Sequence, residues 1–266
     1  MLNIIRASLF KLFRDRTFQI TAIIGFVLAA LTLGVNALVQ TANGQTFFLS
    51  ALTPGSNFGL TIPINLIVFT VGEFTFGTIR NKIIAGLNKV KIYFGLFITG
   101  LVFTFILAGS YALILIGLGS AIGGFDVSKI GGVSFALCYT AYVVCTYIFI
   151  TALSVFFASL FRQIGGAIAV VILILVFVSF LPLIIFASGF GNMELTVEHW
   201  SMWINPLYMT GFYGNNIVTI LAGTGSGEQF FIQSPSMIAA GIVVPLVWTA
   251  IFVIGGLLLF KYTDVK

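Results

Sequence analysis

Six long apolar runs, separated by short polar segments, dominate the pattern of the chain. A transmembrane helix needs roughly 20 mostly apolar residues, because each residue rises about 1.5 Å and the hydrocarbon core is about 30 Å thick. Each run approaches or exceeds that length and predicts a membrane-spanning helix. The predicted spans are Phe18–Val39, Gly59–Phe76, Ile92–Gly119, Gly132–Leu160, Ile164–Ala187 and Met237–Phe260.

Residues 1–16 show a different pattern, in which apolar residues recur at helical spacing and most polar residues fall opposite them. This predicts an amphipathic helix in the inner membrane interface, with its apolar face toward lipid and its cations near the headgroups. A disordered basic leader is the alternative. The residues assigned to this interfacial helix are Leu2, Ile5, Leu9, Lys11, Leu12, Phe13 and Arg14.

The segment between the second and third spans begins with an acid and continues with cations among apolar residues. Glu73 lies near the end of the second span, where a carboxylate is costly unless it is paired or reaches water, and such an acid is a functional candidate. The alternative places it at the inner headgroup level. From Thr78 to Lys91 the apolar residues recur at helical spacing, which predicts a short amphipathic cytoplasmic helix or a simple cationic anchor.

The polar segment before the last span, residues 188–235, is rich in aromatic residues, which favour the membrane interface. Asn205 followed by Pro206 is typical of a helix start, with an N-cap and a proline at the first helical position. We expect one short outer helix to end near Ile204 and a second to run from Pro206 to about Leu221. A loop with incidental aromatics is the alternative. The residues assigned to the outer helices are Trp200, Trp203, Asn205, Pro206 and Tyr208.

In the fourth span, four polar residues fall on one helical face: Thr140, Tyr147, Thr151 and Ser154. Such residues line a pathway or form hydrogen bonds between helices. We favour hydrogen bonds between helices.

Composition and charge fix the class and predict the orientation. With 59% apolar and 7% charged residues, the chain cannot form one water-soluble core, and it is predicted to be an all-α polytopic membrane protein. Cations are retained on the cytoplasmic side, so both termini are predicted to be cytoplasmic, which places eleven of the twelve cations inside. The net charge of +5 then reflects topology rather than nucleic-acid binding. The first apolar run is long enough to stay in the membrane, so no cleavable signal is expected.

The run Glu73, Gly77, Thr78, Arg80 and Lys82 resembles the E-x-x-x-G-T-x-R-x-K segment of type-2 ABC exporter permeases. The layout of an interfacial helix, six spans and a long outer segment is similar as well. The resemblance implies a single permease domain over residues 1–266, outer helices that close the pathway, and a coupling helix over residues 77–87 that sits in a cleft of an ATPase subunit. The residues assigned to this coupling region are Glu73, Gly77, Thr78, Ile79, Arg80, Asn81, Lys82, Ile83 and Leu87.

Partners follow from the same resemblance. The chain contains no Gly-Lys dipeptide and hence no phosphate-binding G-x-x-x-x-G-K-[ST] loop, so a separate ATPase subunit is expected to bind ATP and Mg²⁺. A second permease chain is expected to complete the pathway. Docking is predicted through the apolar face of Ile79, Ile83 and Leu87, with Arg80 and Lys82 at the acidic rim of the cleft. Glu73 is expected to hold the corner through Arg80 or backbone amides.

Other classes are less well supported by the residues. A hydrolase or metal site is not expected, because the single histidine, His199, lacks the spacing to other ligands that such sites need. A stand-alone channel or secondary carrier is the rival transport class, although the chain shows no internal repeat. The expected cargo is a hydrophobic or amphipathic molecule, with an antimicrobial or toxin peptide favoured over a lipid or drug, and the expected location is the bacterial plasma membrane.

Overall fold

The computed structural model describes residues 2–38, 48, 51–52, 60–124, 132–187, 203–207 and 235–262. In these ranges the ordered elements are helices, and six of the helices are long. Their bounds are α1 Leu2–Arg14, α2 Arg16–Leu38, α4 Thr61–Thr75, α5 Thr78–Ile84, α6 Lys89–Gly123, α7 Gly132–Phe161, α8 Ile164–Ala187 and α11 Pro235–Tyr262. The predicted all-α class is confirmed.

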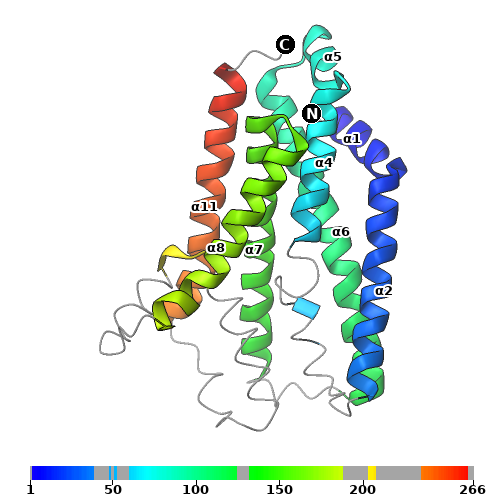
Figure 1. The fold of residues 1–266 in the computed structure, drawn as a ribbon, viewed down its shortest axis with the longest axis vertical. Coiled ribbons are helices and arrows are strands. Elements are labelled where there is room, and N and C mark those ends of the chain that lie inside the picture. The colour runs from blue at the N-terminus through cyan, green and yellow to red at the C-terminus, as the bar shows by residue number, and fades with distance from the viewer. Residues whose placement is uncertain are drawn as a thin grey trace.

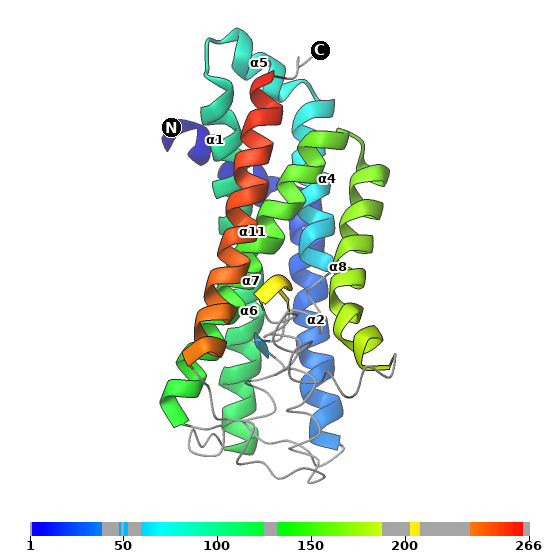
Figure 2. The ribbon, with the colours of Figure 1, turned by 90° about the vertical axis from the view of Figure 1, so that its left-hand side faces the viewer.

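The long helices run side by side along the long axis of the molecule (Figures 1 and 2). α5 and the C-terminal end of α11 lie at one end of the bundle, and α1 lies obliquely beside the start of α2 near that end. Every Lys and Arg of the described residues lies in α1, in α5 or at a helix end on this side. We call it the cation-rich end.

Three described helical segments are long and apolar enough to cross a membrane, namely Lys89–Ala121, Gly132–Phe161 and Ile238–Tyr262. α4 and α5 would form a fourth span if they are taken together, although the chain bends by 52° between them. α2 and α8 contain shorter apolar helical segments, Phe18–Val27 and Ile164–Val178. The chain is therefore a helical membrane protein, and the count of six spans stays a prediction.

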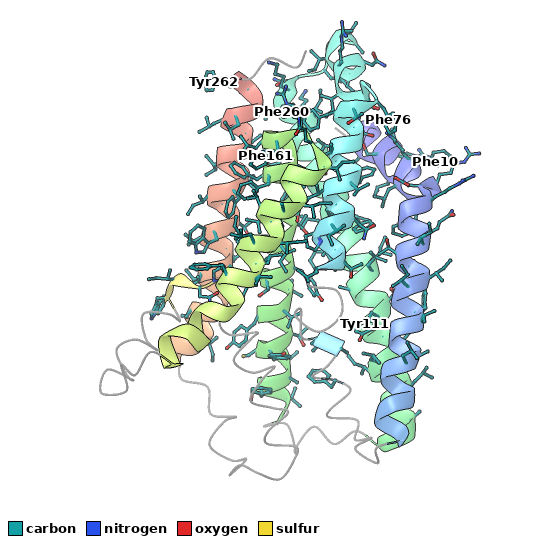
Figure 3. All side chains as sticks on the ribbon, viewed as in Figure 1. Phe10, Phe76, Tyr111, Phe161, Phe260 and Tyr262 are labelled. Carbon is teal, nitrogen blue, oxygen red and sulfur yellow. The ribbon has the colours of Figure 1, made fainter. Side chains whose placement is uncertain are left out.

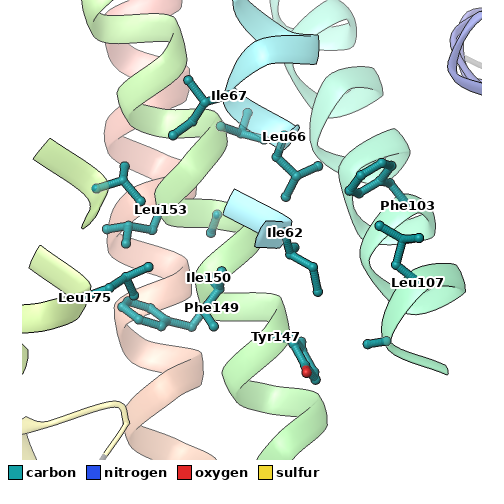
Figure 4. Close-up of a cluster of buried hydrophobic side chains, with 14 of the residues drawn as sticks. Ile62, Leu66, Ile67, Phe103, Leu107, Tyr147, Phe149, Ile150, Leu153 and Leu175 are labelled. Carbon is teal, nitrogen blue, oxygen red and sulfur yellow. The ribbon is translucent and has the colours of Figure 1, made fainter. Parts of the chain in front are cut away.

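α7 lies at the centre of the bundle and contacts α4, α6, α8 and α11. Its buried side chains, including Ile150 and Leu153, meet those of α4 and α6, such as Leu66 and Phe103 (Figure 4). The outer surface of the bundle is apolar as well, with exposed leucines such as Leu113 on α6. This apolar exterior is the pattern expected of helices that face lipid.

Hydrogen bonds between uncharged side chains also join neighbouring helices among the described residues. The Thr21 hydroxyl of α2 donates to Asn65 Oδ1 of α4 at 2.7 Å, and the hydroxyls of Thr104 on α6 and Thr151 on α7 lie 2.9 Å apart. The predicted interhelical bonding of α7 is thus confirmed for Thr151. The Thr140 and Ser154 hydroxyls instead donate to carbonyls one turn earlier in α7, a common way to satisfy a buried hydroxyl.

Part of the predicted outer segment is described, and it joins two helices. The backbone N–H of Leu207 donates to Asn205 Oδ1 at 2.8 Å, the bond that an N-cap at Asn205 would make, and the helix predicted to follow lies mostly outside the described residues. The Asn205 amide donates to the Val178 carbonyl of α8, and the Trp248 indole of α11 donates to the Ile204 carbonyl. The short helical piece at Trp203 and Ile204 is therefore tied to α8 and α11. Trp200, Tyr208 and the predicted helix to Leu221 lie outside the described residues.

Candidate functional site

The motif singled out in the sequence forms a sharp corner at the cation-rich end, and we call residues 73–88 the elbow. α4 ends at Thr75, and Gly77 turns the chain into α5 with a φ of 67°. A residue with a Cβ is strained by about 1–2 kcal/mol in this left-handed conformation, which explains the glycine. The Gly77 N–H donates to the Phe74 carbonyl at 3.1 Å, so one residue closes α4 and precedes α5.

The C-terminal end of α5 is also fixed by a glycine in a left-handed conformation. Gly86 has a φ of 81°, the Gly86 N–H donates to Ile83, and the Leu87 N–H donates to Lys82, which is the hydrogen-bond pattern of a Schellman cap. The Asn88 side chain then caps the start of α6 by accepting from the Val90 N–H at 2.9 Å. α5 is therefore a helix of seven residues with fixed ends, shorter than the predicted range 77–87.

Glu73 lies on the inner side of the elbow and joins three helices. Its side chain is only 1% exposed, so it is buried in protein. The Lys82 ammonium of α5 donates to Glu73 Oε2 at 2.9 Å, and the Lys11 ammonium of α1 donates to Glu73 Oε1. The carboxylate of α4 thus holds α1 and α5 together.

The expected pairing of Glu73 with Arg80 is wrong, for a reason of helix geometry. Lys82 and Arg80 are two residues apart in α5 and so point to nearly opposite sides of that helix. Lys82 faces the bundle with its side chain 17% exposed, whereas Arg80 is exposed. Lys82 is therefore used inside the chain and is not free for a rim contact with another subunit.

The three apolar residues of the predicted docking face point inward, which corrects that prediction. Ile79 is fully buried, and Ile83 and Leu87 pack against the hydrophobic core. They anchor the elbow and are not presented to a partner. Among the residues that the elbow presents outward are Phe76, Arg80, Asn81 and Ile84, and the exposed fractions of Phe76 and Ile84 are 78% and 74%.

The orientation of α1 also differs from the prediction, which placed its apolar face toward lipid. Leu12 is 1% exposed, and α1 packs on α6 and α2, so much of the predicted apolar arc meets protein rather than lipid. Ile5 and Leu9 are half-buried on the same side, whereas Phe13 is 47% exposed. The side chain of Leu2 lies outside the described part. Phe10, which lies outside the predicted arc, is 68% exposed (Figure 3).

Sequence reasoning missed Lys11 as the partner of Glu73, because 62 residues separate them. A lone acid in an apolar segment does signal that a cation must be near, but several cations at the same end satisfy that condition equally. Within the described ranges no group of three or more His, Cys, Asp or Glu residues could hold a metal ion.

No family model matches the chain, and no curated protein matches it.

Proposed function

We propose that this chain is the membrane-spanning permease subunit of an ATP-driven exporter of the type-2 ABC class. The six long helices each cross the plasma membrane of a bacterium, and the elbow and both termini lie in the cytoplasm. A separate ATPase subunit binds ATP and Mg²⁺, and a second permease chain completes the pathway. The cargo is hydrophobic or amphipathic, with an antimicrobial or toxin peptide favoured over a lipid or drug.

The outward face of α5 is the observation that carries this proposal. Ile84 is the last residue of α5, Arg80 and Asn81 lie on the same face one turn before it, and all three are exposed. Phe76 extends the apolar surface at the corner. Large exposed apolar side chains beyond the end of the membrane helices, mixed with polar ones, favour a contact with another protein.

The rigidity of the elbow supports a role in transmitting force. Two left-handed glycines fix the length of α5, and Ile79 together with the Glu73–Lys82 ion pair fixes its inner side. A partner that pushes on α5 would therefore move α4 and α1 as well. We expect the partner to offer an apolar pocket for Ile84 and an acidic group at the rim for Arg80, with the pocket contributing most of the affinity.

The test is coexpression of the chain with its cognate ATPase, followed by copurification. Ile84→Asp should lower the recovered ATPase by about tenfold or more, because a desolvated anchor is commonly worth about 2 kcal/mol. Gln163→Asp is the matched control, since it adds the same charge at an exposed turn between α7 and α8 at the same end. It should leave recovery unchanged. Arg80→Ala should be milder and more sensitive to salt.

Two outcomes would contradict the proposal. Full recovery of the ATPase with Ile84→Asp would remove α5 as the docking element. Cargo movement by the purified chain alone in liposomes, without ATP, would instead favour the stand-alone channel or carrier.

A further inference from the structure

The side of α1 that faces away from the bundle carries a stripe of cations and aromatic rings. Arg6, Phe10 and Arg14 are spaced four residues apart and so lie on one helical face, opposite the buried Ser8 and Leu12. The Arg14 guanidinium carbon lies 5.9 Å from the centroid of the Phe10 ring. Figure 3 shows Phe10 pointing outward at the edge of the molecule, next to the start of α2.

The surroundings of this stripe indicate that it borders lipid. Directly after α1, α2 exposes a series of large apolar side chains: Ile20, Ile23, Ile24, Phe26, Val27 and Leu31. Phe13 lies at the junction and is also exposed. The described side chains of α1 include no acidic residue, and Asp15 directly follows the helix. A cationic and aromatic face at the edge of a lipid-facing surface matches the headgroup layer, where phosphates meet the ends of acyl chains.

We propose that the face made of Arg6, Phe10, Phe13 and Arg14, called here the α1 outer face, binds anionic phospholipid headgroups, and that Lys11 makes α5 responsive to this binding. Lys11 lies on the same helix, and its side chain is 44% exposed. Its ammonium reaches inward to Glu73, whose other oxygen holds Lys82 on α5. α1 held in the headgroup layer keeps Lys11 at Glu73, and Glu73 keeps α5 closed against the bundle. This inference depends on the membrane location and not on the proposed ATPase partner.

The experiment uses the full chain in nanodiscs of phosphatidylcholine, with and without a minority fraction of phosphatidylglycerol. Bound phosphatidylglycerol is counted by native mass spectrometry, and the opening of α5 is followed by trypsin cleavage after Arg80 and Lys82. In the wild-type chain, phosphatidylglycerol should bind and should slow this cleavage severalfold. A cation near an anionic membrane surface is worth about 1 kcal/mol, so Arg6→Gln and Arg14→Gln should each weaken the lipid affinity about fivefold.

Two further variants separate binding from its effect on α5. Lys11→Met should retain most of the bound phosphatidylglycerol, but the lipid should no longer slow the cleavage. Lys91→Met, which removes an exposed cation of α6 at the same end, should behave like the wild-type chain in both measurements. Helix content and elution volume confirm that each variant is folded.

Several results would overturn the inference. Equal cleavage of the wild-type chain in the two kinds of nanodisc would show that anionic lipid does not control the opening of α5. If Lys91→Met loses as much bound phosphatidylglycerol as the arginine variants, the lipid binding depends on net charge and not on the α1 outer face. Protection by inorganic phosphate in pure phosphatidylcholine would identify a site for small anions in place of a lipid surface. Continued lipid protection of Lys11→Met would show that α5 senses the lipid by another route.

Discussion

Glu73 carries a negative charge inside the helical bundle, and the cost of burying that charge determines what its neighbours must be. An isolated carboxylate loses several kcal/mol of solvation when it is buried, and only close, hydrogen-bonded cations compensate for that loss. Both oxygens of Glu73 have such a partner, in Lys11 and Lys82. Removing the carboxylate therefore leaves two ammonium groups facing each other without a counterion.

We expect Glu73→Gln to lower the free energy of unfolding by about 2 kcal/mol, less than for a fully buried pair because both lysines retain some contact with solvent. Lys82→Met should cost more than Lys11→Met, since the Lys11 side chain is 44% exposed and its pair is screened more strongly. Thermal unfolding in a mild detergent measures these differences.

The double variant Glu73→Gln/Lys82→Met is the control for this prediction. Residues that form one ion pair should not contribute independently, so the cost of the double variant should be smaller than the sum of the two single costs by about 1 kcal/mol. Additive costs would show that Glu73 and Lys82 stabilise the elbow separately.

At the scale of the elements, α11 is held against its neighbours by close approach at two glycines. A Cβ at Gly241 would lie 2.6 Å from ring atoms of Tyr142 on α7, and a Cβ at Gly256 would lie 1.9 Å from the Tyr93 hydroxyl on α6. Both tyrosines are fully buried, so neither ring has open space to move into. Small residues that let helices approach closely are a common basis of helix association in membranes.

We therefore predict that Gly241→Ala and Gly256→Ala each destabilise the bundle by about 1–3 kcal/mol, the usual range for overpacking. Gly109→Ala and Gly117→Ala on α6 are matched controls, because a Cβ at either position meets no atom within 4 Å. They should be neutral or slightly stabilising. Unfolding of the four variants in detergent gives the comparison. Equal losses at all four positions would show that close packing against Tyr142 and Tyr93 does not decide the cost, because helix propensity alone favours alanine over glycine.

The bounds of the helices could be predicted well, because long apolar runs between charged segments leave few alternatives. The predicted span Ile164–Ala187 coincides with α8, and Gly132–Leu160 differs from α7 by one residue. The orientation of the short helices was harder to predict. The periodicity of α5 separates Ile79 and Ile83 from Arg80, but it does not say whether the apolar side meets its own bundle or a partner. The same ambiguity misplaced the apolar face of α1, where Leu12 packs inward.

At the scale of the whole molecule, contacts between distant segments could not be predicted from the sequence. The pairing of Lys11 with Glu73 depends on how α1 is placed relative to α4. The close approach at the two glycines of α11 depends on which tyrosines of α6 and α7 lie opposite them. Neither depends on a local pattern. Charge distribution could be predicted, since the described cations gather at one end of the bundle as the predicted topology requires.

That topology makes a prediction about the two sides of the membrane. α6, α7 and α8 lie between Ala85 and Gly225, and an odd number of crossings places these two residues on opposite sides. Ala85 is exposed at the end of α5 and suits labelling better than Asn88, whose side chain caps α6. In a background of Cys138→Ala and Cys145→Ala, an impermeant thiol reagent added to intact cells should label Gly225→Cys. Ala85→Cys should be labelled only after the membrane is permeabilised.

Labelling of these two cysteine variants tests above all whether α8 crosses the membrane. The described apolar stretch of α8, Ile164–Val178, is shorter than those of α6 and α7. If α8 does not cross, only two crossings separate the two positions, and both cysteines must show the same accessibility. Labelling of both from outside, or of neither, would therefore contradict six spans, and labelling of Ala85→Cys alone would reverse the orientation that the cations predict. Labelling of Gly225→Cys alone in intact cells requires α8 to cross and places the elbow on the side where ATP is available.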